Sequence, residues 1–277
     1  MSSPLLSLRL NGRDFSCQVE GEGAPLVMVH GSLCDYRYWQ WQLRGLGEHC
    51  RLIVPSLRHY YPEAWSGEGS DFTTHQHVED LLALLDWIGE PAHLLGHSRG
   101  GNLCLRVALA APERLRSLVL ADPGGDFAAD VFRAAGMVAP VAPAERNRFR
   151  EQALQLIRQG EREAGLQLFV DTVSGEGVWQ RSSRHFREMA ADNAMTLIGQ
   201  VADQPEPLSL AALSGLDVPT LLISGERSPE PFPSVAEALH KVLPVAQVAS
   251  IAGASHGMNA TRPAAFNRAV LGFIATL

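Results

Sequence analysis

The stretch Gly96-His97-Ser98-Arg99-Gly100-Gly101 constrains the fold of the surrounding chain more than any other. It follows the apolar run 91–95 and precedes 102–111, a run rich in Leu, Val and Ala that Pro112 closes. This order predicts a strand, a tight turn and a helix. The glycines leave room in a strained turn where a Cβ would clash, so Ser98 is held up at the end of the strand. Ser98 is therefore a candidate nucleophile; the alternative is a glycine-rich turn with an incidental serine.

Apolar runs alternate with helical patterns over the first 121 residues. Two short strands, 5–10 and 15–20, flank Asn11-Gly12, which is a hairpin signal. Continuous apolar runs without polar alternation are typical of strands buried on both faces of a parallel sheet. The predicted fold class is α/β, with a mostly parallel central sheet flanked by helices and the hairpin as an antiparallel edge. Further strands are predicted at 25–29, 50–54, 92–95 and 118–121, and helices at 36–46, 75–88 and 102–111.

The alternation stops after Asp122-Pro123-Gly124-Gly125. From 127 to about 212 the pattern predicts no strand, only helices at 128–137, 143–159, 161–170 and 178–200. Strands return at 218–224 and 246–251, and helices at 234–243 and 264–274. We therefore predict a core of residues 1–124 and 213–277, with an all-helical cap inserted at 125–212 as a lid over the working edge of the sheet.

A base for Ser98 is predicted at the far end of the chain. A serine hydroxyl is a weak nucleophile at neutral pH and needs a base, which in turn needs an orienting group. Of the ten histidines, only His256 falls in the loop after the last predicted strand. The carboxyl ends of parallel strands meet at one edge, so Ser98 and His256 can meet there; the alternative is a surface histidine. The backbone N–H groups of Ser32 and Arg99 are candidates to hold an oxyanion.

Five motifs occur in a fixed order, and together they resemble the α/β-hydrolase family over nearly the whole chain. The resemblance implies a serine hydrolase, of the carboxylesterase type, that cleaves a small, largely uncharged ester or related carbonyl compound through an acyl-enzyme. It implies no cofactor and no metal. Dehalogenases and epoxide hydrolases of this family carry Asp where Ser98 stands. The motifs are Val27-Met28-Val29-His30-Gly31-Ser32, Pro55-Ser56-Leu57-Arg58, Gly96-His97-Ser98-Arg99-Gly100-Gly101, Leu221-Leu222-Ile223-Ser224-Gly225-Glu226 and Gly253-Ala254-Ser255-His256.

In the family that the motifs resemble, a carboxylate orients the histidine and completes a Ser-His-acid triad. This chain has no carboxylate at the usual position of that acid. That position, three residues after Gly225, holds Ser228. Asp122, at the end of the sixth predicted strand, is the favoured replacement, and Glu226 and Glu230 are alternatives, as is the absence of an acid. The missing acid also leaves open a non-enzymatic or weakly catalytic ligand-binding protein on the same scaffold.

Composition and charge limit the classes of partner that this protein is expected to bind. The net charge of −7, without long acidic or basic runs, argues against a nucleic-acid binder, which needs a basic face. The sequence begins without a charged leader and a long apolar segment, so we expect no membrane span and a cytoplasmic location. The four cysteines are widely spaced, which predicts reduced thiols. The expected partner is a small-molecule substrate, and the expected state is a monomer or homodimer.

Overall fold

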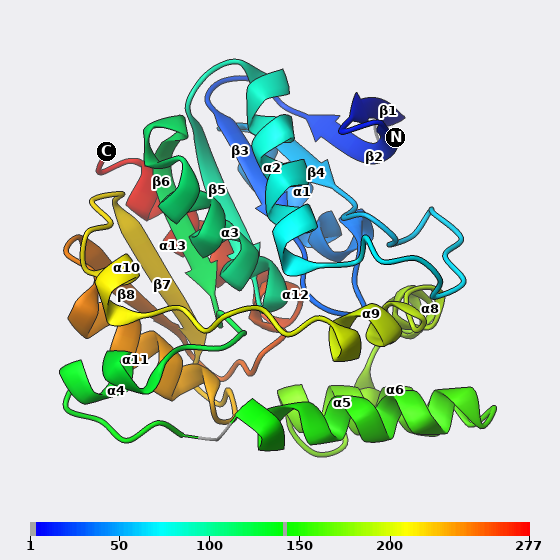
Figure 1. Cartoon of the computed structure of the whole chain (residues 1–277). Helices are drawn as coiled ribbons and strands as arrows, with labels where there is room; N and C mark the ends of the chain where they lie inside the picture. The colour runs from blue at the N-terminus through cyan, green and yellow to red at the C-terminus, as the bar shows by residue number, and fades with distance from the viewer. Residues whose placement is uncertain (1–3, 141–142) are drawn as a thin grey trace.

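A computed structural model describes residues 4–140 and 143–277, and its strands form one sheet (Figure 1). The order across the sheet is β1-β2-β4-β3-β5-β6-β7-β8. β2 pairs antiparallel with β1 and β4, and every other pairing is parallel, which confirms the predicted fold class. The strands are β1 (Leu5–Leu10), β2 (Arg13–Glu20), β3 (Pro25–Val29), β4 (Arg51–Pro55), β5 (Ala92–His97), β6 (Leu115–Ala121), β7 (Thr220–Gly225) and β8 (Ala246–Ile251).

Helices cover both faces of this sheet. α2 and α3 lie on the face turned to the viewer in Figure 1, and α1 and α13 lie behind it. The remaining core helices are α11 and α12, with one 3₁₀ turn before α1 and another before β6. The bounds are η1 (Tyr36–Trp39), α1 (Gln40–Gly47), α2 (Thr74–Ile88), α3 (Arg99–Ala110), η2 (Pro112–Arg114), α11 (Phe232–Val242), α12 (Met258–Thr261) and α13 (Pro263–Ile274).

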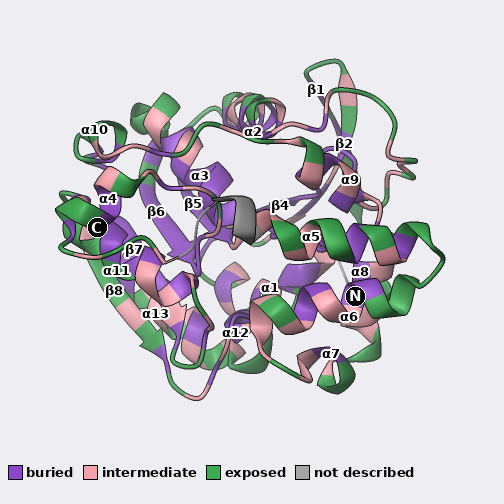
Figure 2. Cartoon of the chain, turned by 60° about the horizontal axis from the view of Figure 1, so that its bottom comes forward, coloured by how far each residue is buried: buried purple, intermediate pink, exposed green. Residues whose placement is uncertain are grey.

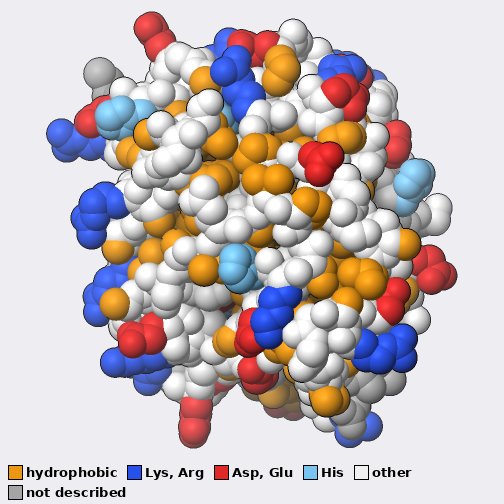
Figure 3. All heavy atoms as spheres, turned by 90° about the vertical axis from the view of Figure 1, so that its left-hand side faces the viewer, with side chains coloured by type: hydrophobic (Ala, Val, Ile, Leu, Met, Phe, Trp, Pro, Cys, Tyr) orange, Lys and Arg blue, Asp and Glu red, His pale blue; other side chains and the backbone are white. Residues whose placement is uncertain are grey.

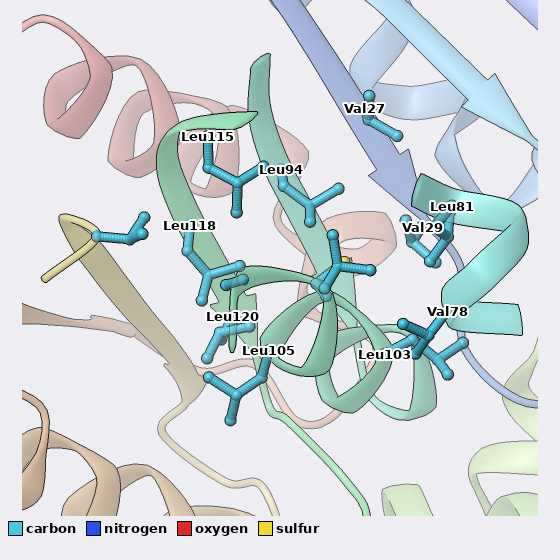
Figure 4. Packing of buried hydrophobic residues seen from close by; sticks show 14 of the residues in the cluster. Val27, Val29, Val78, Leu81, Leu94, Leu103, Leu105, Leu115, Leu118 and Leu120 are labelled. Carbon is cyan, nitrogen blue, oxygen red and sulfur yellow. The ribbon is translucent and has the colours of Figure 1, made fainter. Parts of the chain in front are cut away.

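Side-chain alternation along the strands divides the core into two layers. In β3, Val27 and Val29 belong to the hydrophobic cluster under α2 and α3, and Leu26 and Met28 belong to the cluster under α1 and α13. The close-up shows the first cluster, in which labelled side chains of β3, β5 and β6 lie together with those of α2 and α3 (Figure 4). Because both faces are covered, the central strands are buried throughout (Figure 2). This explains why their sequences read as continuous apolar runs.

Helices occupy the long connection between β6 and β7, as the sequence predicts. α5 and α6 lie across the carboxyl ends of the strands (Figure 1). The prediction of one helix over 178–200 is wrong in one respect, because the structure has three shorter helices in its place. Ser183 interrupts it by capping α8, accepting a hydrogen bond from the Phe186 N–H, and Asn193 ends that helix. The bounds are α4 (Ala129–Ala134), α5 (Pro143–Arg158), α6 (Arg162–Ser174), α7 (Val178–Arg181), α8 (Arg184–Asp192), α9 (Thr196–Ala202) and α10 (Leu210–Leu213).

This connection packs in two different ways. Helices α5 to α9 all contribute to a separate hydrophobic cluster, which Leu33 of the core joins. α4 and α10, at the two ends of the connection, contribute Val131, Phe132 and Leu213 to the cluster of the core sheet instead. We propose that the cap comprises α5 to α9, within the segment 125–212.

The surface carries charges of both signs. On the face seen from the left of Figure 1, Lys and Arg side chains are interspersed with Asp and Glu, and hydrophobic side chains lie between them (Figure 3). No helix in the described part of the chain is long and apolar enough to cross a membrane. All four cysteines are free and buried, as the spacing predicts.

Candidate active site

The turn that carries Ser98 requires both of its flanking glycines. A Cβ on Gly96 would lie 2.4 Å from the Gly100 carbonyl oxygen, and one on Gly100 would lie 2.4 Å from the carbonyl oxygens of Val29 and His30. Ser98 itself has φ of 54°, in the left-handed region that favours glycine. Such strain persists only where the surrounding structure imposes it, and it is concentrated at functional sites. The local geometry is therefore that of a nucleophile elbow.

The elbow also determines where the following helix begins. α3 starts at Arg99, three residues before the helix that periodicity predicts, because Ser98 already occupies its N-cap position. The first N–H groups of a helix have no acceptor within the helix. Neither the Arg99 amide nor the Ser32 amide donates a hydrogen bond to another described residue. Both are available as donors beside Ser98.

The loop that carries Ser32 is held by a buried histidine. His30 Nε2 accepts a hydrogen bond from the Leu57 N–H at 3.0 Å, so Nδ1 bears the proton and donates to the Gly31 carbonyl at 2.9 Å. Burial lowers the pKa of His30 to about 4, which keeps the ring neutral and this arrangement of protons intact. Gly31 lies against the elbow, since a Cβ on it would meet the Ser98 Cβ at 3.0 Å.

A histidine and a carboxylate meet beside the elbow. His256 follows β8, and its Nδ1 lies 3.1 Å from Asp122 Oδ2 at the end of β6. Both residues are buried, Asp122 completely. Asp122 has φ of 40°, so its backbone is also in the left-handed region. The carboxylate accepts the Nδ1 proton, which leaves His256 Nε2 as an acceptor.

Ser228 lies within the same group of side chains. Its hydroxyl donates to Asp122 Oδ2 at 2.5 Å. The residue at the position where the acid is expected from the resemblance therefore contacts the carboxylate of the favoured alternative, Asp122. The other two candidates lie elsewhere: Glu226 is exposed and accepts from the Gly253 N–H at 2.6 Å, and Glu230 is exposed in the turn before α11. The structure brings only Asp122 of the three to His256.

Two rings hold the imidazole of His256 in place. Phe232 stacks on it with centroids 4.0 Å apart, and His97 lies against it at 4.5 Å. His97 Nε2–H also donates to the His256 carbonyl at 2.8 Å. Burial, together with the nearby His256, holds the pKa of His97 well below its usual value. The neutral His97 ring therefore adds no positive charge beside an imidazolium.

A cavity of about 380 Å³ opens over Ser98 and His256, between the sheet edge and the cap. Its volume lies at the lower end of the range for small-molecule pockets, about 300 to 1,000 Å³. Among the described residues that line it, Arg181 is the only Lys or Arg, and none is Asp or Glu. Trp41, which is 56% exposed, also lines it. Its apolar walls include Leu33, Phe169, Val170, Val173, Phe186 and Met189.

Comparison with known proteins shows the family to which the chain belongs. The model of the "Alpha/beta hydrolase family" matches residues 26–269. The chain belongs to this family. The resemblance inferred from the five motifs is thus confirmed, together with the fold that it implies.

Individual relatives are distant. The chain is 25% identical, over 94% of both chains, to RutD of Azorhizobium caulinodans, whose name carries the provisional assignment of carbamate hydrolase. It is 35% identical to the dihydrolipoyllysine-residue acetyltransferase component of the acetoin cleaving system of Pseudomonas putida, over 50% of this chain and only 37% of that protein. A solved esterase of Thermogutta terrifontis is 21% identical, with a TM-score of 0.78 over 99% of both chains, which shows the shared fold alone.

The sequence predicts the candidate catalytic residues of this site but not the side chains that pack around them. Ser98, His256, Ser32, Arg99 and Asp122 lie at one edge of the sheet, where four different loops or strand ends meet. Phe232 carries no sequence signal, because nothing in a helix pattern indicates that a ring will stack on a distant histidine. No group of three or more His, Cys, Asp or Glu side chains within residues 4–140 and 143–277 is placed to hold a metal ion.

Proposed function

We propose that this protein is a serine hydrolase in which Ser98, His256 and Asp122 form the triad. The observation that carries the proposal is the pairing of a buried carboxylate with His256 Nδ1 at 3.1 Å, beside a serine on a strained elbow. A carboxylate in this place selects the tautomer in which Nε2 is a base, and stabilises the imidazolium that forms. This pairing also favours an enzyme over a protein that only binds a ligand in the same pocket.

The reaction follows from the placement of these groups. Ser98 Oγ attacks the substrate carbonyl carbon while its proton passes to His256 Nε2. The amides of Ser32 and Arg99 donate to the oxyanion of the tetrahedral intermediate, where charge develops. The imidazolium then gives its proton to the leaving alkoxide, and an acyl-enzyme remains. Water, deprotonated by His256, attacks this ester and releases the acid and free Ser98.

The cavity favours a small, largely uncharged ester of the carboxylesterase type. Its walls are apolar and its volume is modest, so burial of an apolar acyl or alcohol group supplies the binding energy. No metal or cofactor enters the proposed steps, and all proton transfers are made by His256. We further propose that the substrate is a small molecule and that the protein acts in the cytoplasm as a monomer or homodimer.

A fluorophosphonate probe tests the nucleophile directly. We expect the wild-type protein to be labelled and Ser98→Ala to be unlabelled. Ser255→Ala is the matched control, since Ser255 also lines the cavity but donates its hydroxyl to the Ser174 carbonyl at 2.6 Å. Labelling of Ser255→Ala should equal that of wild type. If the wild-type protein is not labelled, the hydrolase mechanism is refuted and the ligand-binding alternative is favoured. A panel of p-nitrophenyl esters of increasing acyl length then measures the size of substrate that the cavity accepts.

A further inference from the structure

A part-buried hydrogen bond joins the cap to the loop that carries Ser32. The Ser32 hydroxyl donates to Gln200 Oε1 at 2.6 Å. Gln200 lies on α9 of the cap, 168 positions along the chain from Ser32. The glutamine is only 7% exposed. Burying an amide is costly unless it is hydrogen-bonded, so the contact is specific and not an incidental surface pairing.

The amide of Gln200 is fixed from its other side as well. Its Nε2 donates to the Tyr60 hydroxyl and to Thr196 Oγ1, each at 3.4 Å. Tyr60 is buried in the loop after β4, where its ring meets His30 edge-on at 4.7 Å. The acceptor oxygen of Gln200 is therefore directed at Ser32 by contacts with both the core and the cap.

A second buried amide ties the same cap segment to the same loop. Asn193, which is 1% exposed, donates from Nδ2 to Asp35 Oδ2 at 2.7 Å. Its Oδ1 accepts a hydrogen bond from the Tyr61 N–H at 2.8 Å. The cap segment 193–200 is thus attached near both ends to the loop 30–35, through Asn193 at one end and Gln200 at the other.

These contacts hold the Gly31–Ser32 peptide at two points. In a trans peptide the N–H points opposite to the C=O. His30 Nδ1 holds the Gly31 carbonyl at 2.9 Å, and Gln200 holds the Ser32 side chain at 2.6 Å. Together they set the direction of the Ser32 N–H, which makes no hydrogen bond of its own to a described residue. A donor to an oxyanion works only when it is aimed in advance at the place where charge develops.

We propose that Gln200 is a positioning residue that aligns the Ser32 N–H for the oxyanion, so that catalysis depends on a closed cap. This inference rests on the proposed function, because it takes the Ser32 amide as an oxyanion donor. Gln200 does not line the cavity, so its effect passes through Ser32 and not through the substrate. It should therefore alter the transition state more than substrate binding.

A double-mutant cycle tests the link. We expect Gln200→Leu and Ser32→Ala each to lower kcat by about tenfold to a hundredfold, less than the hundredfold to thousandfold typical of deleting a donor, because the N–H remains. KM should change less than about threefold. The double variant should be no slower than the slower single variant, since each change breaks the same hydrogen bond. Affinity for a boronic acid, which mimics the tetrahedral intermediate, should fall in parallel with kcat.

Gln155→Leu is the control, because Gln155 is an exposed glutamine on α5 of the cap; its kcat should equal that of wild type. Ser32→Ala removes only a hydroxyl, so it keeps the test valid if Gln200→Leu does not fold. Losses that multiply in the double variant, or a change in KM alone, would overturn the proposal. Absence of fluorophosphonate labelling in the wild-type protein is a separate result that rejects the hydrolase itself. Intact labelling with unchanged kcat in both single variants rejects only the role of Gln200.

Discussion

Replacing Asp122 by Asn changes one buried atom at the centre of the proposed triad. Asp122 is completely buried, and its Oδ2 accepts hydrogen bonds from His256 Nδ1 at 3.1 Å and from Ser228 Oγ at 2.5 Å. Asn has the same shape, so the fold should be retained. It also removes the negative charge, and it replaces one acceptor oxygen with an NH₂ donor.

The size of the effect depends on which atom of the introduced amide faces His256. If the NH₂ group faces Nδ1, the ring must carry its proton on Nε2, where it cannot take the proton of Ser98. A wrong tautomer of this kind costs about 10⁴-fold in kcat in a serine triad, or about 5.4 kcal/mol at about 1.36 kcal/mol per factor of ten. If the oxygen faces Nδ1, only the charge is lost and the effect is smaller. We therefore expect a loss of at least about a hundredfold.

Steady-state turnover of a p-nitrophenyl ester measures this loss. Glu226→Gln is the matched control, because the Glu226 side chain is exposed and accepts its hydrogen bond from the Gly253 N–H, away from His256; its activity should stay close to wild type. The reverse ranking, with Glu226→Gln impaired and Asp122→Asn active, would show that the acid has been assigned wrongly. Thermal unfolding of both variants checks that they are folded.

Ser228 offers a second arm of the same experiment. Its hydroxyl already reaches Asp122 Oδ2, so a carboxylate at position 228 lies near enough to approach His256 Nδ1. We expect Ser228→Asp, added to Asp122→Asn, to restore turnover at least about tenfold over Asp122→Asn alone, since a charged acceptor again faces the ring. No recovery in a folded double variant would mean that the position cannot replace Asp122.

Two further predictions concern stability. Gly100→Ala should lower the free energy of unfolding by about 3 kcal/mol, because its Cβ would lie 2.4 Å from two carbonyl oxygens. Gly272→Ala is the control, because a Cβ on Gly272 would meet nothing within 4 Å. Equal urea midpoints for the two variants would refute the argument. Stability should also fall as the pH drops from about 6.5 towards 4, because burial lowers the pKa of His30 to about 4 and the unfolded chain then binds more protons. The free energy of unfolding, measured in urea, should be roughly 1 kcal/mol lower at pH 5.5 than at pH 7.5 through His30 alone.

The sheet could be predicted because its chemistry is simple. A central parallel strand is buried on both faces, so it must be apolar at every position, and β3 and β6 are recognisable for that reason. The cap is harder to predict. A helical period over 178–200 does not reveal where the helix is interrupted, because Ser183 interrupts it through a side-chain hydrogen bond that competes with the helix.

In the candidate site, too, some features could be predicted from the sequence and others could not. Ser98 and His256 could be paired from sequence because topology alone brings the carboxyl ends of parallel strands together. The contact of Gln200 with Ser32 could not be predicted, since it joins a cap helix to a core loop 168 positions away. No local pattern distinguishes Gln200 from a solvent-exposed glutamine.

The position of the acid illustrates how topology limits the places where chemistry can lie. β6 and β7 are neighbours in the sheet, and the Asp122 N–H donates to the Ile223 carbonyl of β7 at 2.8 Å. The end of β6 and the turn after β7 are therefore next to each other, and Asp122 and Ser228 contact although 106 positions separate them. Asp122 Oδ2 lies against His256 Nδ1 and also accepts the Ser228 hydroxyl. The proposed acid on β6 therefore lies next to the position after β7, and the topology of the sheet lets it face the histidine from the neighbouring strand.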